Sequence, residues 1–137
     1  MREQEFSLHK AQVYRLLISI LDNPEISPCI GFKGGTCAAM LGYLDRFSVD
    51  LDFDNLEKTG KKELRSELHR IFKNNNLEIK DESKKALQFF LRYEAPPGQR
   101  NTLKLEILDK KFRNNIYKPQ YLPDIDRFAI CKNIESR

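Results

Sequence analysis

The sequence has no long hydrophobic run. Its most apolar stretch, VYRLLISIL, is interrupted by Arg15, whereas a helix that crosses a bilayer needs about 20 consecutive apolar residues. The first ten residues, MREQEFSLHK, are too polar for the apolar core of a signal peptide. These absences argue against a membrane-spanning protein and against a cleaved secretion signal.

Cysteine and histidine are scarce, and their spacing does not suggest a zinc site. Cys29, Cys37 and Cys131 are odd in number and form no CxxC pair. We expect reduced core thiols in a cytoplasmic protein and no disulfide framework. His9 and His69 fall in stretches of helical periodicity without ligand-like spacing, so both are expected at the surface.

Two common nucleotide-binding motifs are also missing. The sequence contains neither GxxxxGK[ST] nor GxGxxG, which disfavours P-loop chemistry and dinucleotide binding. It has no repeat and no low-complexity segment. The 137 residues are 40% hydrophobic and 32% charged, which is ordinary for one globular domain. The net charge of +4 tolerates an anionic partner without demanding one, because the basic residues are interspersed with 20 acidic ones.

The hydrophobic periodicity changes along the chain. Helical spacing predicts helices over 6–21, with Ser7 as a possible N-cap, and over 36–44 and 61–76. Short apolar or alternating segments predict strands over 29–33, 48–54, 77–80, 86–94, 102–108 and 127–131. The segment APPGQRN at 95–101 is typical of a turn that joins two strands. This order predicts an α+β fold, a mixed β-sheet flanked by helices, and not a doubly wound one.

The strand predicted over 48–54 carries an unusual number of carboxylates. Its core-facing set is Val49, Leu51 and Phe53, and its opposite face holds Ser48, Asp50, Asp52 and Asp54. A solvent-facing side is the simpler explanation, but aspartate is a poor strand former and neighbouring carboxylates repel. A divalent cation would offset that repulsion, because Mg²⁺ takes hard oxygen ligands from one or two carboxylates and from substrate phosphates. Asp50 and Asp52 are therefore candidate metal ligands.

A second alternating strand offers a third carboxylate. Lys104 and Glu106 share one face of the strand predicted over 102–108. If this strand lies beside the acidic one, Glu106 completes a trio with Asp50 and Asp52, and Lys104 can meet a phosphate. An exposed ion pair between Lys104 and Glu106 is the alternative.

The pair Gly34-Gly35 lies between a predicted strand and a predicted helix. Such a turn presents free backbone N–H groups at a helix N-terminus, where phosphate binds. Thr36 can add a hydroxyl and Lys33 a positive charge. A tight turn without any ligand is the alternative. Taken together, the glycine turn and the carboxylates suit a nucleoside triphosphate bound through magnesium and attacked at its α-phosphate.

These segments resemble the AbiEii-type nucleotidyltransferase toxins, part of the nucleotidyltransferase superfamily that includes DNA polymerase beta. The stretch FKGGTCAAMLGYLDRFSVDLDFD, at 32–54, contains the KGGT turn and the RxSxDxDF strand of that family, and a later strand supplies its lysine–hydrophobic–acid pattern. The matching positions are Lys33, Gly34, Gly35, Thr36, Arg46, Ser48, Asp50, Asp52, Phe53, Lys104 and Glu106. Glu106 stands where aspartate is commoner.

The resemblance implies a role for each matching residue. Asp50 and Asp52 would be metal-binding catalytic carboxylates, with Glu106 as the third. Gly34, Gly35, Thr36 and Ser48 would hold the triphosphate, and Lys33, Arg46 and Lys104 would neutralise its charge. The implied cofactor is Mg²⁺ or Mn²⁺. The implied partners are an NTP, an RNA acceptor such as the 3′ end of tRNA, and a cognate antitoxin.

The family usually continues into a helical C-terminal half, so residues 1–137 are expected to form its single nucleotidyltransferase domain without that region. Two other functions stay open. One is a relative of the same fold that binds nucleotide or antitoxin without catalysis. The other is a basic RNA-binding module, for which KKELR, KDESKK and DKKFRNN are the candidate segments.

Overall fold

Seven strands form one mixed sheet in the computed structural model, which describes residues 2–45, 49–56, 60–109 and 116–133. The strands are β1 (Ile30–Lys33), β2 (Asp50–Asn55), β3 (Glu78–Glu82), β4 (Leu87–Arg92), β5 (Thr102–Asp109), β6 (Tyr117–Leu122) and β7 (Arg127–Lys132). Their spatial order is β3-β4-β5-β2-β1-β7-β6. The pairs β2–β5 and β1–β7 are parallel, and the other neighbours are antiparallel. The predicted mixed sheet is confirmed.

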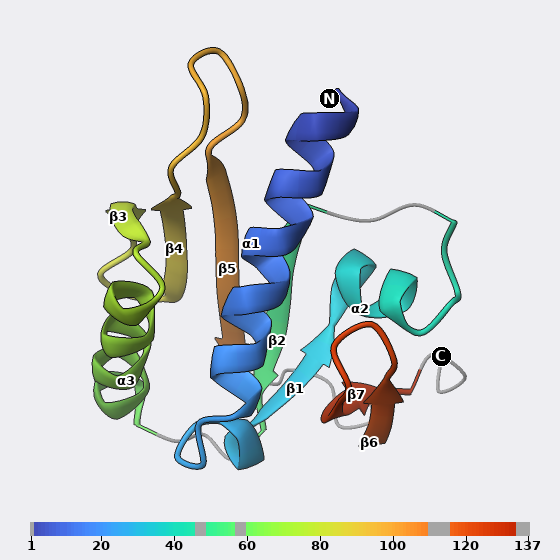
Figure 1. Cartoon of the computed structure of the whole chain (residues 1–137). Helices are drawn as coiled ribbons and strands as arrows, with labels where there is room; N and C mark the ends of the chain where they lie inside the picture. The colour runs from blue at the N-terminus through green and yellow to red at the C-terminus, as the bar shows by residue number, and fades with distance from the viewer. Residues whose placement is uncertain (1, 46–48, 57–59, 110–115, 134–137) are drawn as a thin grey trace.

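Three α-helices accompany the sheet in the described residues: α1 (Glu3–Leu21), α2 (Gly34–Met40) and α3 (Lys61–Asn74), with a short 3-10 turn, η1 (Ser27–Cys29). Figure 1 shows α1 and α3 on the same side of the sheet. The predicted N-cap at Ser7 is wrong, because α1 begins earlier, after Arg2. Its first turn carries Glu3 and Glu5, whose charges suit the positive end of a helix dipole. Within the described residues, no helix combines the length and apolar composition needed to cross a bilayer.

The hydrophobic core fills the space between the sheet and the helices α1 and α3. Strand residues in it include Leu51, Phe53, Phe89 and Leu105, and helix residues include Leu16, Leu17, Leu68 and Phe72. The predicted inward direction of Leu51 and Phe53 is confirmed, since both are fully buried, whereas Val49 is only half-buried. Because strand side chains alternate, Asp50 and Asp52 project from the opposite face.

Strand β6 was not predicted. It contains Pro119, which cannot donate a hydrogen bond to a neighbouring strand. The strand is tolerated because it lies at the edge of the sheet and pairs with β7 alone. The predicted hairpin around 95–101 is confirmed by the antiparallel pairing of β4 and β5.

The prediction of a surface position is wrong for His9, which is fully buried. It lies on the side of α1 that faces the sheet, where its ring contacts the hydroxyl of Tyr93 and the carbonyl of Val49. His69 is partly exposed and lies 3.0 Å from a carboxylate oxygen of Glu82. Cys37 and Cys131 are buried, as expected for core thiols, and Cys29 is half-buried.

Candidate functional site

The register of β2 against its two neighbours brings five of the predicted site residues together. In the parallel pair with β5, Asp50 lies opposite Lys104 and Asp52 lies opposite Glu106. In the antiparallel pair with β1, Lys33 lies opposite Asp52. Paired residues of adjacent strands project from the same face. The expectation that the strand at 102–108 lies beside the acidic strand is therefore confirmed.

Asp52 occupies the electrostatic centre of this arrangement. Its half-burial raises the pKa of its carboxyl group, and the negative charges of Asp50 and Glu106 raise it further. The positive charges of Lys104 and Lys33 act in the opposite direction without cancelling the rise. The site therefore has an excess of negative charge that the protein itself does not fully balance.

Glu106 is held from the neighbouring strand β4. The side-chain amide of Gln88 donates a hydrogen bond of 3.1 Å to Glu106 Oε2, and Lys104 Nζ lies 4.0 Å from the same oxygen. Gln88 is directly opposite Glu106 in the antiparallel pair. Sequence analysis missed Gln88, because its contribution becomes visible only once the pairing of the two strands is known.

The turn from β1 into α2 passes directly against Asp52. Gly34 has φ +84°, a conformation that residues with a side chain rarely adopt. A Cβ atom added there would lie 2.7 Å from Asp52 Oδ2. Two separate constraints therefore require glycine at this position. The predicted placement of Gly34 and Gly35 at the first turn of a helix is confirmed.

Thr36 connects the same helix to the acidic strand. Its side chain is fully buried, and its hydroxyl donates a hydrogen bond of 2.5 Å to the backbone carbonyl of Asp50. The ladder between β1 and β2 ends at the pair of Lys33 and Asp52. Beyond that pair, the hydroxyl of Thr36 provides the hydrogen bond to β2. Thr36 thereby fixes α2 against the first residue of β2.

The other end of β2 is neutralised within the protein. Lys33 Nζ lies 2.6 Å from Asp54 Oδ1, and the hydroxyl of Tyr117 donates to the second carboxylate oxygen of Asp54. The side chain of Asp54 is only 5% exposed. The ring of Tyr117 lies against Gly31, where a Cβ atom would collide with it. Sequence analysis missed Tyr117 because it missed β6.

Comparison with known families identifies the family of the chain. Residues 15–128 match the family model for the AbiEii nucleotidyl transferase toxin of type IV toxin–antitoxin systems. The chain belongs to the AbiEii family. The match contains Asp50, Asp52, Glu106 and the glycine turn.

Two solved structures resemble the AbiEii chain over 98% of its length. One is described as a "putative nucleotidyltransferase from H. pylori", with 26% identity and a TM-score of 0.55, and 56% of its chain is covered. The other is JHP933 from Helicobacter pylori, with 26% identity and a TM-score of 0.57, of which 54% is covered. The chain thus spans about half the length of each. No curated protein matches it.

Two of the predicted AbiEii site residues, Arg46 and Ser48, lie outside the described residues. Within the described ranges, no group of three or more His, Cys, Asp or Glu side chains is arranged to hold a metal ion by itself. A magnesium site made of one or two carboxylates and substrate phosphates needs fewer protein ligands. Asp50 and Asp52 supply hard oxygens whose repulsion a cation would relieve. They fit a cation that binds together with a phosphate-bearing substrate.

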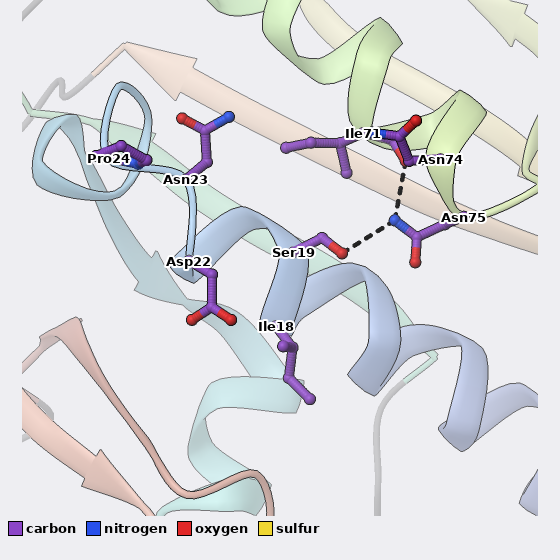
Figure 2. Close-up of a pocket in the computed structure, with 8 residues that line it drawn as sticks. All are labelled: Ile18, Ser19, Asp22, Asn23, Pro24, Ile71, Asn74 and Asn75. Carbon is purple, nitrogen blue, oxygen red and sulfur yellow. Dashed lines mark hydrogen bonds between the residues drawn. The ribbon is translucent and has the colours of Figure 1, made fainter.

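A pocket of about 390 Å³ lies elsewhere on the AbiEii chain. Figure 2 shows it between the C-terminal ends of α1 and α3, on the helix-covered side of the sheet. There Asn75 donates hydrogen bonds to Ser19 Oγ and to the carbonyl of Ile71. Since no predicted site residue lines this pocket, it is separate from the acidic strand.

Proposed function

We propose that this AbiEii chain transfers a nucleotide from an NTP to an acceptor hydroxyl, in a reaction that depends on Mg²⁺ or Mn²⁺. The observation that carries the proposal is the alignment of Asp50 and Asp52 with Glu106, beside a glycine turn that touches Asp52. Membership of the AbiEii family supports the transferase class.

The reaction is a displacement at the α-phosphate. The acceptor oxygen forms a new bond to phosphorus, the bond from that phosphorus to the bridging oxygen breaks, and pyrophosphate leaves. A bound Mg²⁺ would activate the attacking oxygen and steady the leaving one. Asp50 and Asp52 would hold the cation. Glu106, whose carboxylate Gln88 orients, would accept the proton of the acceptor hydroxyl or orient that hydroxyl.

The triphosphate would lie over the turn between β1 and α2. Backbone N–H groups of Gly34 and Gly35 supply donors there, and Lys33 supplies a positive charge. Because the hydroxyl of Thr36 is already used on the carbonyl of Asp50, we assign its phosphate contact to the backbone N–H. Lys104 would neutralise charge from the other side of β2. Ser48 and Arg46 keep the triphosphate contacts that the family resemblance implies.

The proposed acceptor is RNA, with the 3′ end of tRNA as the first candidate, and the proposed regulator is a cognate antitoxin. Both would meet the chain in the cytoplasm, where NTPs and magnesium are plentiful. The family description, which is that of a toxin in type IV toxin–antitoxin systems, supports the antitoxin; the RNA acceptor rests on the resemblance given in the sequence analysis.

The decisive experiment is thermal unfolding with each of the four NTPs, with and without Mg²⁺. A ligand at about 100 times its dissociation constant stabilises by roughly 2.7 kcal/mol, which is several degrees for a domain of this size. We expect a magnesium-dependent shift in the wild type and in Asp81→Asn, a matched change on the exposed part of β3, but none in Asp52→Asn. Equal shifts in Asp52→Asn would contradict the metal assignment.

A transfer assay then separates catalysis from binding. NTP labelled at the α-phosphate is incubated with the chain, Mg²⁺ and total tRNA, and labelled RNA and pyrophosphate are measured. Label in RNA supports the proposal. A thermal shift without product favours the alternative of a nucleotide-binding relative, and salt-sensitive RNA binding that survives Asp52→Asn favours an RNA-binding module.

A further inference from the structure

His9 is a fully buried polar side chain that the proposed reaction does not use. It projects from α1, and its two ring nitrogens make long-range hydrogen bonds. Nδ1 lies 2.8 Å from the hydroxyl of Tyr93, just beyond β4, and Nε2 lies 2.8 Å from the backbone carbonyl of Val49. One imidazole therefore joins three segments that are far apart in the sequence.

The chemistry of the partners determines where the ring proton is. A carbonyl oxygen only accepts, so Nε2 carries the hydrogen that is donated to Val49. Nδ1 of the neutral ring then accepts from the hydroxyl of Tyr93. Burial lowers the pKa of His9, and the positive charge of Arg100 acts in the same direction, whereas the hydrogen bond to Val49 and the charge of Asp50 oppose it. The neutral Nε2–H form satisfies every polar atom of the ring.

The carbonyl that His9 holds belongs to the residue immediately before Asp50. The next carbonyl, that of Asp50 itself, is held by Thr36. The β2–β5 register begins at Asp50, and the β1–β2 register ends at Asp52. The strand start is thus fixed by two fully buried side chains from two helices, at a point where the ladders provide little support.

We propose that His9 is a positioning residue that fixes the start of β2 and so places the carboxylate of Asp50. The proposal rests on the proposed function in assigning Asp50 a place in the reaction. Because His9 precedes the residues that match the family model, it is an inference from the packing of this chain. Catalytic groups must be held closely, since a displacement of about 1 Å can reduce a rate 100-fold.

Two substitutions differ in which ring nitrogen they replace. In His9→Gln the amide nitrogen lies as many bonds from Cβ as Nε2 does, so it can still donate to Val49. In His9→Asn the amide reaches only the level of Nδ1. The same two changes at His69 are the matched controls, because His69 contacts Glu82 on the edge strand β3, which β4 and β5 separate from β2.

The first readout is amide hydrogen exchange of Asp50 and Leu51 by NMR, which requires no nucleotide. We expect faster exchange in His9→Asn than in the wild type, restoration in His9→Gln, and no change in either His69 variant. Equal exchange at these two amides in all variants would overturn the proposal. If His9→Asn does not fold, Tyr93→Phe keeps the proposal testable, because it removes the hydroxyl that holds Nδ1 and so loosens the ring that donates to Val49. Faster exchange at Asp50 and Leu51 is then expected, and unchanged exchange would overturn the proposal.

Two further readouts distinguish positioning from simple stability. Nitrogen-15 spectra of the histidine rings should show His9 as the neutral Nε2–H form at pH 7, and an Nδ1–H form would overturn the assignment. In the transfer assay, His9→Asn should lower kcat about 10–100-fold with little change in KM for the NTP. A wild type that neither binds nor transfers NTP refutes the proposed function, while the exchange comparison still decides the role of His9.

Discussion

The carboxylates at the two ends of the acidic strand β2 lie in opposite electrostatic environments. Asp54 is almost fully buried, yet Lys33 and Tyr117 satisfy its two oxygens. Asp52, two residues earlier on the same face, is half-buried beside Asp50 and Glu106, and the pKa of its carboxyl group is raised. One end of the strand carries a charge that the protein balances, and the other carries charge that we propose a ligand to balance.

The comparison separates the carboxylate that the protein itself pairs from the carboxylates that we propose to bind a ligand, without reference to any motif. A buried carboxylate is tolerated when it is paired and hydrogen-bonded. Carboxylates that repel one another on a strand weaken the fold unless a cation joins them. Lys33 stands between the two halves, opposite Asp52 in the register and ion-paired with Asp54, so Asp54 also fixes the position of a proposed phosphate contact.

The largest effect is expected from Asp52→Asn. This change removes the central carboxylate of the proposed metal site, and we expect nucleotide transfer to fall by at least about 100-fold. The free energy of unfolding without ligand should stay equal or increase at pH 7, because a repelling charge is removed. Transfer kinetics and denaturant unfolding measure the two quantities. Loss of activity together with loss of stability would refute the view that this charge is functional.

The second-largest effect is expected at Asp54, where the substitution removes a charge that the protein balances. Asp54→Ala leaves the ammonium group of Lys33 and the hydroxyl of Tyr117 without their shared partner, so we expect a loss of about 2–4 kcal/mol in the free energy of unfolding. Tyr117→Phe removes one hydrogen bond and should cost about 1 kcal/mol. Denaturant unfolding of both variants provides the measurement. A cost for Asp54→Ala no larger than that for Tyr117→Phe would show that the ion pair contributes little.

The sequence was sufficient to predict the elements whose signal is local. The alternation of 48–54 and 102–108 predicted β2 and β5 and the face of each carboxylate, and the helical spacing over 61–76 predicted α3. Mg²⁺ dependence and the roles of individual site residues stay predictions. What could not be predicted depends on contacts between elements that are far apart in the sequence. Gln88, Tyr117 and His9 meet their partners 18, 63 and 40 residues away.

The third effect tests how closely the glycine turn approaches Asp52. Gly34→Ala adds both a strained backbone and a Cβ atom 2.7 Å from Asp52 Oδ2, whereas Gly42→Ala adds only the strain, since Gly42 has φ +85° and open space around it. We expect Gly42→Ala to cost about 1 kcal/mol and Gly34→Ala about 1–2 kcal/mol. Only Gly34→Ala should weaken the magnesium-dependent thermal shift by NTP. Equal effects of both variants on that shift would separate the turn from the site.

The smallest effect is a pH dependence of the stability of Asp52→Asn relative to the wild type. In the wild type the pKa of Asp52 is higher in the folded than in the unfolded chain, so the unfolded chain loses its proton first as the pH rises. Wild-type stability therefore falls with pH between the unfolded and the folded pKa, and this contribution is absent in the variant. The stability advantage of Asp52→Asn should be fully present above the folded pKa and vanish below the unfolded one. Paired denaturant titrations from pH 3 to pH 7, with Asp81→Asn as the exposed control, provide the measurement. An advantage that grows as the pH falls would mean that the protein balances the charge of Asp52 as it balances that of Asp54.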